Sequence, residues 1–298
     1  MGTTQLTPTG VGIHHVLIAT DFSSCSNQAL DVGLKLAKAY QAEASIALVL
    51  PSNEFMLAGP DAYVAARDAA CRDLENLKVA LRSSRAYIEG SDYHLYLLEG
   101  EVAPRILNFA QEKKVDLIIV GTHGRQGLGK ALMGSVAERV FRGSPVPVMT
   151  IGPSASHAAE VLTPRNILAA VDFTPASEQA ARYAAAIAAE RHAKLTLLHV
   201  LNPKEMSHAP DQSLILQEAE RKLSALLGDG QNLSTELVVK TGRLVPTILE
   251  TERQSNADLL VLGVRPSLAA LSRFMWPNAH EIVRESSCPV LTVKGSER

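Results

Sequence analysis

Aromatic residues, charge of one sign and long apolar runs are all scarce in this chain. It has 298 residues, of which 4% are aromatic, and a formal net charge of −2. Such a balanced charge gives no electrostatic reason to expect nucleic acid or an anionic membrane as a partner. No apolar run reaches the ~18 residues that a membrane-spanning helix needs, so we expect no membrane insertion.

Cysteine is scarce as well. Cys25, Cys71 and Cys288 lie far apart, and no Cys-x-x-Cys pair occurs. This excludes a disulfide framework or a zinc site and fits a reducing compartment. The N-terminal residues are polar and uncharged, unlike a signal peptide. We therefore expect a cytoplasmic protein.

The sequence repeats itself. A strand-like run ends in Asp-Phe-Ser at 21–23, and a similar run ends in Asp-Phe-Thr at 172–174, an offset of 151. Further on, Asp116–Gly121 matches Asp258–Gly263 at an offset of 142. Since the order of the matches is preserved, we infer a duplication.

The repeat predicts two domains, residues 13–152 and 163–295. Between them lies a short junction rich in Ser, Ala and Pro. The change of offset places a nine-residue length difference between about Leu50 and Gly100. Because the junction is short, we expect the two domains to pack against each other.

Each copy alternates apolar strands with helices. In the first copy, strands are predicted at about 14–20, 44–50, 93–98, 116–121 and 146–151, and helices at about 24–41, 61–86, 101–114 and 134–143. This alternation predicts an α/β fold with a doubly wound, Rossmann-like, five-stranded parallel sheet of order 3-2-1-4-5 in each copy. No helix follows the last strand of either copy. We expect these open edges to pair as an internal pseudo-dimer.

A glycine-rich loop follows the fourth predicted strand of the first copy. Its spacing is Gly-x2-Gly-x9-Gly-Ser, formed by Gly121, Gly124, Gly134 and Ser135. Gly124 and Gly134 would let a phosphate approach the backbone, and Ser135 and Val136 would offer amides at a helix N-terminus.

Charge and position support the same interpretation. Arg125 and Lys130 add positive charge, and no acidic residue occurs between Gly121 and Ala137. In the predicted strand order, ligands bind between the first and fourth strands, at their carboxyl ends. Asp21 would contact an adenine amino group or a ribose hydroxyl there, and Val49 would line the adenine slot.

Simpler interpretations stay open. Glycines after strands are often turns, and Gly-Ser before a helix is often a cap. Asp21 is equally suited to cap the helix that follows it, and Val49 to fill the core. The segment 124–130 fits the start of a P-loop, Gly-x4-Gly-Lys. Ala131 follows it where a Ser or Thr hydroxyl should hold Mg²⁺, so we reject a P-loop NTPase.

Together these features resemble a tandem universal stress protein. ATP-binding members of that family carry the Gly-x2-Gly-x9-Gly-Ser/Thr loop that the first copy matches. The resemblance implies ATP bound with Mg or Mn through its phosphates, a stress-linked role and dimer formation through the last strand. The implied ATP contacts are Asp21, Val49, Thr122 or His123, Gly124, Gly134, Ser135 and Val136.

The second copy departs from the pattern. Gly263 is kept, but Pro266, Trp276 and Pro277 replace the other two glycines and the serine. Proline removes amide donors, and Trp276 would fill the phosphate space. We therefore expect one nucleotide per chain, in the first copy.

The expected function is an ATP-binding regulatory module that is not an enzyme. The alternative is a slow ATPase or another adenine-nucleotide enzyme on the same fold. No residue is visibly placed as a general base or nucleophile, and the signatures of related transferases are absent. A ligand-free scaffold is a third hypothesis, which the retained Gly124, Gly134 and Ser135 argue against.

Overall fold

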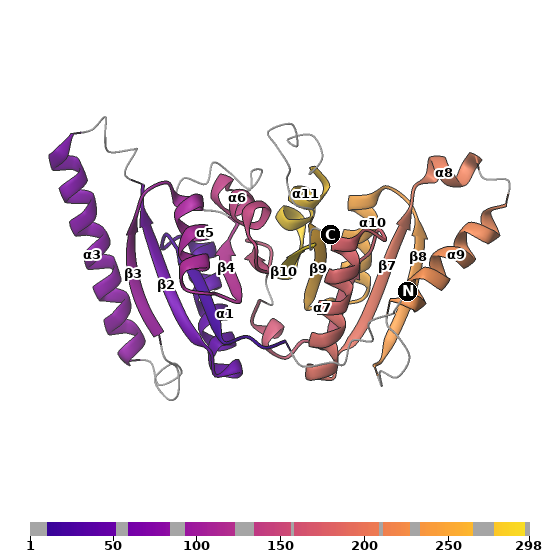
Figure 1. Ribbon diagram of the computed structural model, residues 1–298, viewed down its shortest axis with the longest axis horizontal. Coiled ribbons are helices and arrows are strands. Elements are labelled where there is room, and N and C mark those ends of the chain that lie inside the picture. The colour runs from indigo at the N-terminus through magenta and orange to yellow at the C-terminus, as the bar shows by residue number, and fades with distance from the viewer. Residues whose placement is uncertain are drawn as a thin grey trace. The chain divides into compact units, whose positions relative to one another are not determined.

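The protein is described by a computed structural model (Figure 1). It covers residues 11–51, 59–83, 93–122, 134–155, 158–208, 211–226, 233–264 and 277–295, without the side chains of residues 159, 205, 208 and 277. The chain forms two compact units, Ile13–Pro153 and a unit whose main part is Ser154–Arg298. They are called the first and the second unit below.

The first unit is built on five parallel strands: β1 (His15–Thr20), β2 (Glu43–Leu50), β3 (Tyr93–Glu99), β4 (Leu117–Gly121) and β5 (Val148–Ile151). Their order is β3-β2-β1-β4-β5. This is the predicted order 3-2-1-4-5. It places the change of winding direction between β1 and β4, where open α/β sheets bind ligands.

Four helices of the first unit are described: α1 (Ser24–Tyr40), α3 (Pro60–Ser83), α5 (Val102–Glu112) and α6 (Ser135–Gly143). Helix α1 begins where the Ser23 side chain accepts the amide of Ser26, and ends at Gln41, which has a φ of 54°. A side-chain oxygen at the start and a left-handed residue at the end are common helix boundaries.

The second unit repeats this arrangement with parallel strands in the order β8-β7-β6-β9-β10. The strands are β6 (Asn166–Ala170), β7 (Lys194–Leu201), β8 (Thr235–Thr241), β9 (Leu259–Val264) and β10 (Val290–Lys294). The helices are the 3-10 turn η1 (Ala158–Leu162), α7 (Pro175–Arg191), α8 (Pro203–His208), α9 (Gln212–Ala225), α10 (Leu244–Gln254) and α11 (Pro277–Glu285).

Small side chains let the helices lie close to the strands. A Cβ on Gly33 of α1 would stand 2.6 Å from the Ile18 side chain of β1. In α7 most of the buried residues are alanines. Central strands such as β1 and β4 are buried on both sides, so the core forms with few aromatic residues.

The two units differ in length where the sequence predicts. The segment between β2 and β3 is nine residues longer than that between β7 and β8. The first unit has the long helix α3 in this region, and the second has the shorter α8 and α9. Across the described residues, no helix combines the length and the apolar character needed to cross a membrane.

Candidate functional site

The turn between β1 and α1 fixes Asp21. Its Oδ1 accepts the Ser23 amide at 3.0 Å, and its own amide donates to the Ser26 hydroxyl at 3.4 Å. Ser23, rather than Asp21, is the N-cap of α1. Phe22 between them has a φ of 61°, an unusual value for a bulky side chain. Asp21 therefore supports the capping residue.

The same turn recurs in the second unit. Asp172 Oδ1 accepts the amide and the hydroxyl of Thr174 at 3.1 and 2.5 Å, and the Asp172 amide donates to Ser177 at 3.1 Å. Phe173 has a φ of 60°. Because this turn is complete in the copy that lacks the glycine-rich loop, its aspartate has a structural role in both units.

Gly121 brings the end of β4 against the start of α1. A Cβ at Gly121 would stand 2.7 Å from the Cys25 carbonyl carbon and from the Ser26 amide nitrogen. Gly263 has the same contact with α7, at 2.3 Å from the Ser177 amide nitrogen. The first glycine of the loop motif is therefore needed for packing, which explains why the second copy keeps it.

Thr122 holds the two ends of the loop together. Its carbonyl accepts the Gly134 amide at 2.6 Å, and its own amide donates to the Ile151 carbonyl at 2.9 Å. Thr122 is fully buried. The Gly134 amide is thus already used inside the protein, and the predicted role of Gly134, a close approach of phosphate to the backbone, does not depend on this donor.

Helix α6 begins beside this bond. Gly134 is its N-cap and provides no side-chain acceptor. The amides of Ser135, Val136 and Ala137 have no acceptor within the described ranges, as is usual for a first helical turn. Val136 is 36% exposed. The amides available to an anion are thus those of Ser135, Val136 and Ala137. The sequence predicts the first two, and the structure adds Ala137.

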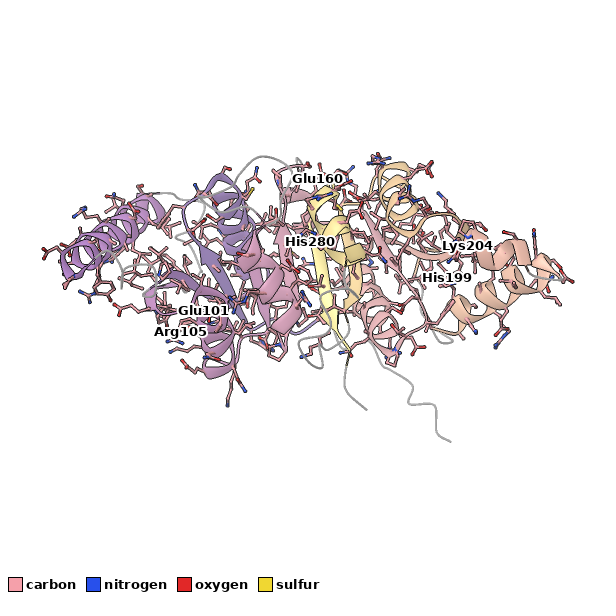
Figure 2. All side chains as sticks on the ribbon, turned by 90° about the horizontal axis from the view of Figure 1, so that it is seen from above. Glu101, Arg105, Glu160, His199, Lys204 and His280 are labelled. Carbon is pink, nitrogen blue, oxygen red and sulfur yellow. The ribbon has the colours of Figure 1, made fainter. Side chains whose placement is uncertain are left out.

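The charges near the start of α6 are paired. The Glu138 carboxylate accepts Arg142 at 2.9 Å, which reduces its repulsion of an anion. Arg139 pairs with Glu101, which precedes α5. Glu101 and Arg105 are labelled together at the surface of the first unit (Figure 2). The Arg139–Glu101 ion pair therefore connects α6 with the segment that follows β3.

The remaining predicted residues divide into two groups. Val49 lies near the carboxyl end of β2 and is 8% exposed, so most of its surface already packs inside the unit. His123, Gly124, Arg125 and Lys130 lie outside the described residues, and their roles stay predictions.

The second unit keeps the helix at the equivalent position. Helix α11 begins at Pro277, and α6 begins at Ser135, 142 residues earlier. Proline is well suited to a first helical position because its missing amide would have no partner there. The exchange therefore preserves the helix and removes a donor. Arg265, Pro266, Arg273 and Trp276 lie outside the described residues.

Side chains at the carboxyl ends of β6 and β7 form a stack of rings that differs from the side chains at the equivalent positions of the first unit. A His199 ring nitrogen donates to the Val171 carbonyl at 2.7 Å, and the ring centroid is 4.4 Å from that of Phe173. Lys222 lies over Phe173 at 5.5 Å. His199 and Lys204 are labelled at this part of the second unit (Figure 2). Leu48 is the counterpart of His199 in the repeat.

No protein metal centre is formed among the described residues, where no three His, Cys, Asp or Glu side chains are grouped for one. The described part of the site thus offers backbone amides and the Ser135 hydroxyl at the start of α6. These groups suit an anionic ligand. Sequence reasoning missed the Thr122–Gly134 bond and the role of Ser26. For Ser26 a signal existed, because Ser26 and Ser177 recur at the repeat offset.

The fold is therefore that of a duplicated protein with two doubly wound α/β units. The model of the universal stress protein family matches residues 12–152 and again 163–294. The chain therefore belongs to the universal stress protein family, with two copies in tandem.

Individual relatives support this family assignment. Universal stress protein MJ0531 of Methanocaldococcus jannaschii is 33% identical over 138 residues, covering 46% of this chain and 80% of that protein. Universal stress protein YxiE of Bacillus subtilis is 34% identical over 151 residues, covering 46% and 97%. A solved universal stress protein from Archaeoglobus fulgidus matches 97% of this chain and 98% of its own, at a TM-score of 0.74 and 19% identity, which supports the fold.

Proposed function

We propose that this protein is an ATP-binding regulatory member of its family, with one nucleotide in the domain at 13–152 and none in the domain at 163–295. The observation that carries the proposal is the Thr122–Gly134 bond. Because of this bond, α6 and the open amides of Ser135, Val136 and Ala137 begin beside Thr122, which follows β4, and Gly121 of β4 packs against the start of α1.

This arrangement suits the phosphates of a nucleotide. Amides at a helix N-terminus favour an anion through their hydrogen atoms and the helix dipole. The Ser135 hydroxyl would add a donor, and Arg125 and Lys130 would add positive charge. Mg or Mn would be held through the phosphates. The adenosine end would lie toward Asp21 and Val49.

Regulation, rather than catalysis, is the favoured role. The sequence places no residue visibly as a general base or in-line nucleophile, which favours a site that holds a nucleotide. Occupancy would bias conformation or partner choice. Slow hydrolysis remains the alternative activity of the same site.

The test is to purify the protein from cells, denature it and identify any nucleotide that is released. ATP supports the regulatory proposal, and ADP favours turnover instead. No nucleotide, together with no ATP uptake by the purified chain, would contradict both.

A matched variant is available within the repeat. Ser135→Pro copies the second unit, deletes one amide and one hydroxyl, and should leave α6 in place. We expect it to lose the nucleotide while its circular dichroism and melting temperature stay close to those of the parent. Pro277→Ser is the reciprocal control and should not create a second site.

A further inference from the structure

A second candidate site lies in the first unit, between α3 and β3. A groove of about 500 Å³ runs there. Its apolar part is formed by Leu74, Leu95 and Leu97, and its polar part includes Lys78 and Arg82. Of the 24 residues of α3, the structure buries Ala70, Leu74 and Leu81, so this helix covers the strand incompletely.

The strand beside this groove has an open edge. Within the described residues β3 pairs with β2 alone. The Gly100 amide donates to Leu50 of β2 at 3.1 Å. Successive residues of a strand direct their backbone groups to opposite sides, so those of Tyr93, Leu95, Leu97 and Glu99 point away from β2. A row of such groups is a template for another strand.

The sequence of β3 lacks the residues that usually block strand addition. The strand β3 reads YHLYLLE, with no proline or lysine and one carboxylate at its end. The counterpart β8 reads TELVVKT and carries Glu236 and Lys240. Proline, lysine and other charges are the common means of protecting an edge, so β8 is protected and β3 is not.

The charge of the groove favours an acidic occupant. Lys78 is paired with Glu75 at 3.2 Å. Arg82, which also lines the groove, has no carboxylate partner in the described part of the chain. At the opposite end of β3, Glu99 is neutralised by Arg67 at 3.3 Å. Among the described residues, the positive charge without a carboxylate partner therefore lies where α3 ends and β3 begins.

Geometry favours a single extended strand over a second copy of this chain. Helix α3 runs along the β3 edge of its unit (Figure 1). Strands in a sheet are spaced by about 4.8 Å, whereas packed helices need about 8–10 Å. Two copies joined edge to edge would bring a second α3 helix to this edge. One added strand needs only the width of a strand there.

We propose that the groove and the open edge of β3 bind an extended acidic segment of a partner protein by strand addition. Its backbone pairs with Tyr93, Leu95, Leu97 and Glu99. Its apolar side chains on one face contact the leucines of the groove, and its carboxylates contact Arg82 and Lys78. Strand addition with pockets for alternate side chains is a known mode of peptide recognition.

The test measures fluorescence anisotropy of labelled peptides against the full chain. The probe is an end-blocked eight-residue peptide in which valine and glutamate alternate. One matched peptide has lysine in place of glutamate. Two others keep the side chains but are N-methylated at alternate residues, one at the valines and one at the glutamates. We expect the glutamate peptide to bind about tenfold more tightly than the lysine peptide, and at least one of the two alternate N-methylation patterns to abolish binding.

Protein variants locate the site. Arg82→Glu should weaken the glutamate peptide by about fivefold or more. Arg72→Glu, on the same helix but outside the groove, should change it by less than about twofold. No binding at millimolar peptide, equal affinity for both charges, or undiminished binding of both N-methylated peptides would each overturn the proposal. Self-association of the chain that Arg82→Glu abolishes would instead assign the edge to a second copy.

Discussion

Gly121 and Gly263 lie where a strand end meets the first turn of a helix. In both units the neighbouring atoms are backbone atoms of that helix, which cannot move independently of it. A methyl group at either position would push the helix away from the strand. Gly121 thus keeps the start of α1 close to the carboxyl end of β4, and Gly263 does the same for α7 and β9.

Gly121→Ala should therefore lower the free energy of unfolding by about 1–3 kcal/mol, as overpacking of a core does. Gly143→Ala is the matched control. Its Cβ would also stand 2.7 Å from a neighbour, but that neighbour is the flexible end of Leu107, so we expect less than about 1 kcal/mol. Urea unfolding of both variants provides the comparison, and equal losses would contradict this account.

The three cysteines should differ in reactivity. Cys25 and Cys288 are buried and Cys71 is exposed. Burial, and next the nearby Glu252 carboxylate, raises the pKa of the Cys288 thiol far above its ordinary value. A raised thiol pKa keeps the group protonated and unreactive through neutral and mildly alkaline pH. Iodoacetamide at pH 7 and at pH 9 should label Cys71 alone in the native protein, as read by mass spectrometry.

At the scale of elements, α10 carries a contact that the first unit does not have. Glu252 is 1% exposed, and its Oε1 accepts the Ser287 amide and hydroxyl, both at 2.7 Å, and the Cys288 amide at 3.2 Å. The repeat offset places Ala110 at this position of the first unit. The carboxylate fixes the turn between α11 and β10.

Glu252→Ala should destabilise the second unit by about 2–3 kcal/mol, because it leaves buried donors without an acceptor. Glu250→Ala on the same helix removes an exposed contact with Gln254, and should cost less than about 0.5 kcal/mol. Thermal unfolding by calorimetry distinguishes the two. A similar melting temperature for both variants would show that the Glu252 contact contributes little.

The element boundaries were largely predictable from sequence because the apolar strands and the repeat gave two independent signals. The helix predicted at 61–86 is described over Pro60–Ser83, and the strand predicted at 146–151 begins at Val148. Proline at 147 has no amide to donate to a ladder, although its carbonyl accepts Ile118.

The local site was less predictable. The Asp-Phe-Ser pattern showed a turn but not the left-handed Phe22, a conformation that bulky residues rarely adopt. The Thr122–Gly134 bond joins residues across a long loop, and no local pattern encodes such a contact. The predicted roles of His123, Gly124, Arg125 and Lys130 concern residues outside the described ranges and stay predictions.

At the scale of the whole molecule, duplication has produced two units with one fold and different surfaces. The first has open amides at α6 and an open edge at β3. The second has a proline at the equivalent helix start and charges on the equivalent strand. Pairing of the last strands as an internal pseudo-dimer stays a prediction. The differences explain how one chain would bind a single nucleotide.

Isothermal titration calorimetry of the nucleotide-free chain with ATP and Mg²⁺ tests this claim most directly. We predict one site per chain, which is lost in Ser135→Pro and unchanged in Pro277→Ser. Two equivalent sites per chain, or one site that persists in a folded Ser135→Pro protein, would contradict it.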